Sequence, residues 1–175
     1  AAKKATYDYW ALGNNTSQPA GWWLQATREA SIGKNLGLER TARLFALVSM
    51  GLADSVAPTY MTKYTFQFWR PTTAIREADT DSNPTTIQDA TWAARANTVG
   101  GSPEYWSGHS SFSAVAAAIL AGFFCDDAIS TTLASDSKPL DVRTFASFSA
   151  AAAENEVSCS TSTDNGWATG QTQRH

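Results

Sequence analysis

The chain has 175 residues, of which 43% are hydrophobic and 17% are charged, and its formal net charge is -3. This length suits a single domain with a hydrophobic core of ordinary size. The acidic balance argues against nucleic acid as a partner, because a phosphate backbone requires a basic face, although a local basic cluster can still bind a small anion. No apolar run approaches the roughly 20 residues that a membrane span requires, so we expect no membrane span.

The two cysteines, Cys125 and Cys159, match no zinc-binding spacing and are too few for a disulfide framework. We expect two buried thiols, with a single bridge between them as the alternative. Two overlapping triplets over residues 14–17, Asn-Asn-Thr and Asn-Thr-Ser, fit the N-glycosylation pattern. They favour a secreted or otherwise extracytoplasmic location.

Hydrophobic spacing predicts helices in the first half of the chain. One helix is expected from about Gly21 to Lys34, and a second begins near Leu38. The apolar stripe of the second helix follows steps of three and four and consists of Phe45, Val48, Leu52 and Val56. Pro58 should kink or interrupt this helix. The pattern then resumes towards Phe66 and ends before Arg70-Pro71.

The second half combines two irregular stretches with further helices. Residues 77–105 read as a long polar loop, with at most a short helix around 89–95. A strong helix follows over 110–124, and we place it at the centre of the core. Its inward face comprises Phe112, Val115, Ala116, Ile119, Leu120, Phe123 and Phe124.

After an irregular stretch over 126–139, Asp141 is a plausible N-cap of a helix that turns Phe145, Phe148 and Ala152 inward. No convincing alternating strand appears, so the predicted fold class is all-α, a helical bundle over residues 1–175.

Lys63 and Arg70 are seven positions apart, almost two helical turns, so on one helix they share a face. The apolar stripe, continued by steps of three and four, leads to both of them. Unpaired buried cations are costly, so the pair requires an anion or acidic partners. Arg offers a planar fork that fits an oxyanion, whereas Lys acts as a mobile point charge. The alternative is that both extend to solvent, as most charged side chains do.

Ser107, Gly108 and His109 lie where the long loop meets the apolar helix. Backbone N–H groups at a helix start lack partners, and the helix dipole favours negative charge there. Gly108 lets an anion approach the backbone, and the Ser107 hydroxyl can donate to it. His109 can donate a proton, accept one, or act as a nucleophile. Alone, this segment also fits a simple serine N-cap followed by a surface histidine.

Taken together, these segments resemble the vanadium-dependent haloperoxidases and the related type 2 phosphatidic acid phosphatases. The family pattern Lys-x6-Arg-Pro is present over residues 63–71, and Pro-Ser-Gly-His reads Trp-Ser-Gly-His over 106–109. Further stretches that resemble the bacterial-type branch are 43–47, 68–76, 103–105 and 144–151. Because family members are longer at the N-terminus, the resemblance suggests a C-terminal portion of such a chain.

The resemblance implies that Lys63, Arg70, Ser107 and Gly108 hold the oxygens of vanadate in a helical bundle, and that phosphate or sulfate can occupy the same site. His109 matches the histidine that acts in acid–base steps as hydrogen peroxide and halide react. The partners implied are a small oxyanion, hydrogen peroxide and a halide. No separate metal site is expected, and an oligomer is compatible with the pattern.

The family's third segment, Ser-Arg-x5-His, has no match, since residues 158–163 read Ser-Cys-Ser-Thr-Ser-Thr. That segment supplies a second arginine and the histidine that binds vanadium or attacks phosphorus. Three interpretations therefore stand: a haloperoxidase or a protein derived from one, an acid phosphatase on the same scaffold, and a non-catalytic storage, defence or carbohydrate-binding protein that kept the fold.

Overall fold

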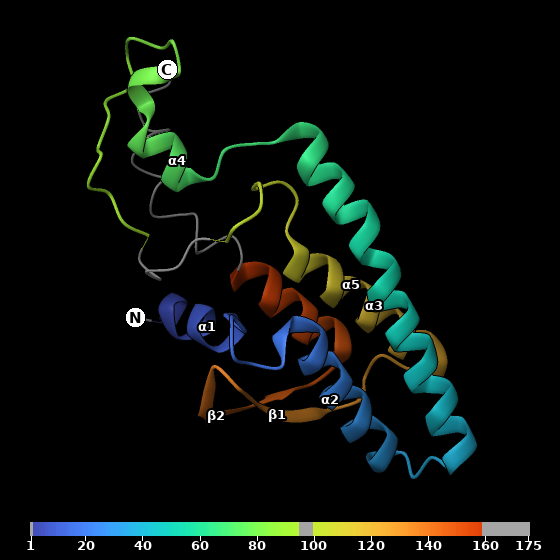
Figure 1. Cartoon of the computed structure of the whole chain (residues 1–175). Coiled ribbons are helices and arrows are strands. Elements are labelled where there is room, and N and C mark those ends of the chain that lie inside the picture. Colours follow the sequence, from blue (N-terminus) through green and yellow to red (C-terminus); the bar gives the residue numbers. More distant parts are fainter. Residues whose placement is uncertain (1, 95–99, 159–175) are drawn as a thin grey trace.

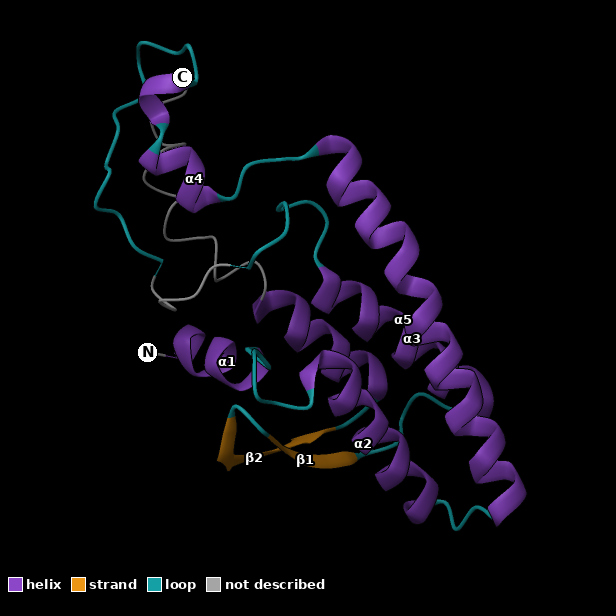
Figure 2. Ribbon diagram, in the orientation of Figure 1, coloured by secondary structure: helices purple, strands orange, loops and turns teal. Residues whose placement is uncertain are grey.

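A computed structural model describes residues 2–94 and 100–158 of the chain. The helices are α1 (Ala2–Trp10), α2 (Gln18–Gly33), α3 (Leu38–Phe66), α4 (Pro71–Arg76) and α5 (Gly108–Phe124), with a short 3-10 helix η1 (Ala78–Thr80). Two strands follow, β1 (Thr131–Ser135) and β2 (Lys138–Phe145), and a further helix runs over residues 148–158. The fold is thus a mostly helical bundle, as predicted, with one small sheet (Figure 2).

The sheet corrects the all-α prediction. β1 and β2 form an antiparallel hairpin in which Thr131 pairs with Phe145 and Leu133 with Arg143. Asp141 is no helix N-cap but lies in β2, and its carboxylate pairs with the guanidinium of Arg143 at 2.6 Å. The hairpin was not predicted because two of the three buried positions of β1 carry polar side chains. Buried and exposed positions alternate along the strand, but hydrophobic and polar residues do not.

The core lies where α2, α5, the hairpin and the helix over 148–158 meet α1. Figure 1 shows α2 beside the hairpin and the long α3 running along the outer side of α5. Large aromatic rings fill this core, with the rings of Trp10 and Trp22 only 4.6 Å apart between centroids. The large side chains that are fully buried include Tyr9, Trp10, Leu12, Trp22, Trp23, Leu44, Leu120 and Phe148. Burial of this apolar area is the main stabilising contribution.

α5 begins close to the predicted position and packs against both α3 and α2. Its fully buried residues are mostly small, whereas the predicted large side chains Phe112, Ile119, Phe123 and Phe124 pack at the border of the core. The hydroxyl of Ser113 accepts hydrogen bonds from the Trp23 indole at 3.0 Å and from the Asn155 amide at 2.6 Å. This buried polar contact joins α2, α5 and the helix over 148–158.

α3 continues through Pro58, so the predicted interruption of the helix does not occur. A proline removes the hydrogen bond to the carbonyl four residues earlier, here that of Asp54. Both Asp54 and Pro58 are exposed, so water can satisfy that carbonyl and the helix persists. The buried stripe also differs from the predicted one and comprises Leu44, Val48, Leu52, Ser55, Thr59 and Lys63.

The stretch Leu38–Arg76 is long and apolar enough to cross a membrane by length and composition, and 28% of its most apolar window is buried. This is weak evidence for a span, because core helices of soluble proteins meet the same criterion. α3 packs against α5 and α2 in the bundle.

Beyond α3, the chain departs from the bundle. Figure 1 shows α4 and the loop after it standing away from the other helices, past the last turn of α3. Pro71 begins α4, where its missing N–H carries no cost. Residues 90 and 91 form a turn and the rest of the described stretch 89–94 is irregular, so no short helix is present there. Cys125 is a free, exposed thiol and not a buried one, and Cys159 lies outside the described residues.

Candidate oxyanion site

Lys63 occupies the last turn of α3, and only 4% of its surface is exposed. Its position on the buried stripe follows from the helical period, as the sequence predicts. The ammonium group donates to two backbone carbonyls of the following loop, that of Pro103 at 2.6 Å and that of Glu104 at 3.1 Å. These carbonyls stabilise a cation that would otherwise be buried at high cost.

Arg70 contacts the same loop, but it does not lie on the helix on which it was predicted. It is the N-cap of α4, beyond the end of α3, and so does not share a helical face with Lys63. Its Nε donates to the carbonyl of Ser102 at 2.7 Å, and its Nη1 lies 3.0 Å from the carboxylate of Glu104. The two cations therefore bind three successive residues, 102–104, of the loop that leads into α5.

Ser107 is the N-cap of α5, and its hydroxyl accepts a hydrogen bond from the Ser110 amide at 3.2 Å. Gly108 is the first residue of the helix. A Cβ added at Gly108 would meet only a ring atom of Phe112, at 3.9 Å, so protein packing does not require glycine here. An N-cap with an open glycine leaves the first N–H groups accessible to an anion.

His109 lies in the first turn of α5, largely buried, and its Nε2 has no hydrogen-bond partner among the described residues. The imidazole also makes a hydrogen bond to the backbone of Ala11. Burial lowers the pKa of His109, and the positive charges of Arg70 and Lys63 lower it further, whereas the Ala11 contact opposes the shift. Arg70 and Lys63 are therefore close enough to act electrostatically on His109, which is neutral at pH 7.

The lowered pKa of His109 gives the chain a pH-dependent stability. The unfolded histidine takes up a proton near its ordinary value of 6.5, but the folded one does so only at lower pH. The free energy of unfolding should therefore fall as the pH falls through 6.5. We expect the His109→Gln variant to show a shallower fall in urea denaturation between pH 7.5 and 5.5, and an unchanged slope would contradict this account.

Three features near these residues were not predicted as part of the site. Glu104 pairs with Arg70, as described above. A Cβ at Gly100 would lie 2.5 Å from Nη2 of Arg70, so a larger residue there would displace the guanidinium from its present position. The indole of Trp106 donates to the hydroxyl of Thr59 at 3.0 Å, which ties the loop to α3. The Gly100-Gly101 pair was the one sequence signal of a close approach.

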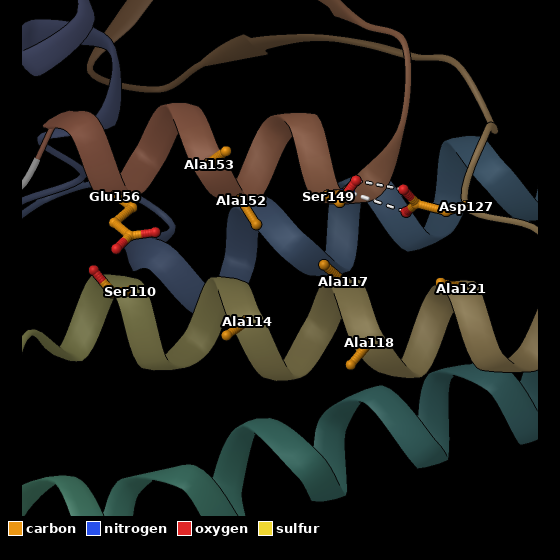
Figure 3. A pocket seen from close by; sticks show the side chains of 10 residues that line it. All are labelled: Ser110, Ala114, Ala117, Ala118, Ala121, Asp127, Ser149, Ala152, Ala153 and Glu156. Carbon is orange, nitrogen blue, oxygen red and sulfur yellow. Dashed lines mark hydrogen bonds between the residues drawn. The ribbon is translucent and has the colours of Figure 1, made fainter.

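A separate hollow of about 420 Å³ lies between α5 and the helix over 148–158. Figure 3 shows it lined mainly by alanines, with Ser110 and Glu156 at one end and the hydrogen-bonded pair Ser149 and Asp127 at the other. None of the five predicted site residues lines it. The candidate site is thus a cluster at the α5 N-terminus and not the interior of this hollow.

Comparison with known proteins decides the family. The sequence over residues 43–168, more than half of the chain, matches the VCPO second helical-bundle domain. The chain belongs to this family. Among solved structures, it is similar to the first bacterial vanadium-dependent iodoperoxidase described by a crystal structure, with a TM-score of 0.73 and 24% sequence identity. That match covers 98% of this chain but only 42% of the iodoperoxidase chain. No curated protein sequence matches.

The resemblance to vanadium-dependent haloperoxidases is therefore confirmed at the level of family and fold. Two of the family's three segments lie on elements that the structure describes, at the end of α3 and at the start of α5. The third would follow Ser158 and falls outside the described residues.

Proposed function

We propose that Lys63, Arg70, Ser107, Gly108 and His109 form an oxyanion site, and that the chain serves the oxidation of a halide by hydrogen peroxide with vanadate as cofactor. One observation carries this proposal. Lys63 and Arg70, from separate elements, both bind the loop over 102–104 that leads directly into the N-terminus of α5.

The residues fit vanadate or phosphate in charge and in donors. Lys63 and Arg70 carry two positive charges and Glu104 one negative, which leaves one positive charge beside a neutral His109. A singly charged tetrahedral anion would balance it. The Nε2 of His109, buried without a partner among the described residues, is a further polar atom that such an anion can satisfy.

Each residue has a distinct role in this proposal. Arg70 can orient two oxygens with its fork, while Lys63 contributes charge from the other side. The N–H groups at the start of α5 add the positive end of a helix dipole. Vanadate, when bound, supplies the centre at which peroxide and halide react. His109, neutral at pH 7, can hold or accept a proton at Nε2 beside that centre.

Bromination of a phenolic dye with vanadate, bromide and hydrogen peroxide tests the proposed activity. We expect turnover that requires vanadate and is strongly reduced in the Lys63→Ala variant, because the anion loses one of its two cations. Absence of turnover from acidic to neutral pH would refute the activity. In that case, hydrolysis of an aryl phosphate that vanadate inhibits would indicate a phosphatase, and anion binding without either reaction would indicate a non-catalytic protein.

A further inference from the structure

Glu104 is an unexpected residue in a site for anions. Its carboxylate lies 3.0 Å from Nη1 of Arg70, and its own backbone carbonyl accepts from the ammonium group of Lys63 at 3.1 Å. The side chains of Arg70 and Glu104 are 25% and 30% exposed, so the pair is mostly shielded from water. Glu104 thus contacts both cations that the oxyanion would use, Arg70 through its carboxylate and Lys63 through its backbone carbonyl.

A carboxylate in this position has different effects on different anions. It repels an oxyanion that carries no proton, because two negative groups then compete for Arg70. It attracts an oxyanion that carries a hydroxyl, since a carboxylate accepts up to four hydrogen bonds and this salt bridge uses one oxygen. Backbone carbonyls also accept from the ammonium group of Lys63 and from Nε of Arg70, so the carboxylate is one of several acceptors around these two cations.

We propose that Glu104 is a specificity-determining residue, which makes the site prefer tetrahedral oxyanions that carry a proton, such as phosphate and vanadate, over sulfate, which carries none. This inference rests on the proposed oxyanion site. The Glu104 carboxylate also reduces the net charge of Lys63, Arg70 and Glu104 to a single positive charge. This charge matches a protonated monoanion better than a dianion.

The alternative is that Glu104 only holds Arg70 in place. Both views predict that loss of the carboxylate changes anion affinity, but they predict different effects on the ratio of the phosphate affinity to the sulfate affinity. A positioning role would alter phosphate and sulfate binding to the same extent. A selective role would alter mainly the affinity for sulfate, because only sulfate lacks a proton to donate to the carboxylate.

Calorimetric titration at pH 7 with inorganic phosphate and with sulfate tests the inference on the wild-type chain and three variants. The wild type should bind phosphate at least about tenfold more tightly than sulfate, the range of one charge-assisted hydrogen bond. Glu104→Gln should strengthen sulfate binding by about tenfold and bring the two affinities close together. Glu104→Asp keeps the carboxylate and should keep the preference for phosphate.

The matched control is Glu39→Gln, which removes the same charge from the exposed first turn of α3. It lies 24 residues before Lys63 on the same helix, or about 36 Å along the axis, and should change neither affinity. A phosphate-to-sulfate ratio that is the same in the wild type and in Glu104→Gln would overturn the selective role while leaving the anion site intact. Failure of the wild type and of Glu104→Gln to bind either anion would overturn the oxyanion site itself.

Discussion

An Arg70→Ala substitution is expected to weaken binding of phosphate or vanadate by about tenfold or more. A hydrogen bond to a charged group contributes roughly 1.5 to 3 kcal/mol, and the guanidinium can offer two of them to one anion. Arg70→Lys should be nearly as harmful, since an ammonium group keeps the charge but cannot reproduce the planar fork. Calorimetric titration of both variants measures the loss.

The control for this prediction is Arg76→Ala. Arg76 ends α4, six positions after Arg70, is exposed, and donates to the carbonyl of Trp92 at 2.6 Å. Its removal takes away the same charge from the same part of the chain without touching residues 102–104. Equal losses of anion affinity in Arg70→Ala and Arg76→Ala would show that Arg70 acts through the net charge of the chain and does not contact the anion directly.

A Leu120→Ala substitution is expected to lower the free energy of unfolding by about 2 to 5 kcal/mol. Leu120 is completely buried on α5, where that helix packs against α2 and α3. Removal of its isobutyl group leaves a cavity among side chains that cannot fully relax. Urea denaturation, with the midpoint and slope both fitted, measures the change.

The matched control is the same substitution at Leu140, which is 99% exposed on β2. Leu140→Ala should change the free energy of unfolding by less than about 0.5 kcal/mol, as surface substitutions usually do. Similar values for the two variants would contradict the placement of α5 in the core.

The spacing of residues in the sequence was sufficient to predict the parts of the site that depend on a helical period or on the end of a helix. The burial of Lys63 follows from its place on the α3 stripe, and Ser107 as the N-cap of α5 follows from the meeting of a polar loop with an apolar helix. The end of α3 before Arg70-Pro71 was predictable for the same reason.

Contacts between distant residues were not predictable in this way. Arg70 was placed on the same helical face as Lys63, but it reaches the loop from the N-cap of α4. The salt bridge to Glu104 depends on how a loop 34 residues further along the chain returns to Arg70. β1 was missed because tertiary packing against Tyr9 buries Ser135, whose hydroxyl donates to the Tyr9 carbonyl.

A crystal structure of the chain soaked in vanadate tests the central claim most directly. The account predicts one anion at the start of α5, in contact with the Lys63 ammonium group, the Arg70 guanidinium and the amide of Gly108 or His109. It also predicts that at least one of the present bonds from Lys63 or Arg70 to residues 102–104 is exchanged for a bond to the anion. Density for vanadate elsewhere, with Lys63 and Arg70 still bound to residues 102–104 and in contact with no anion, would contradict the account.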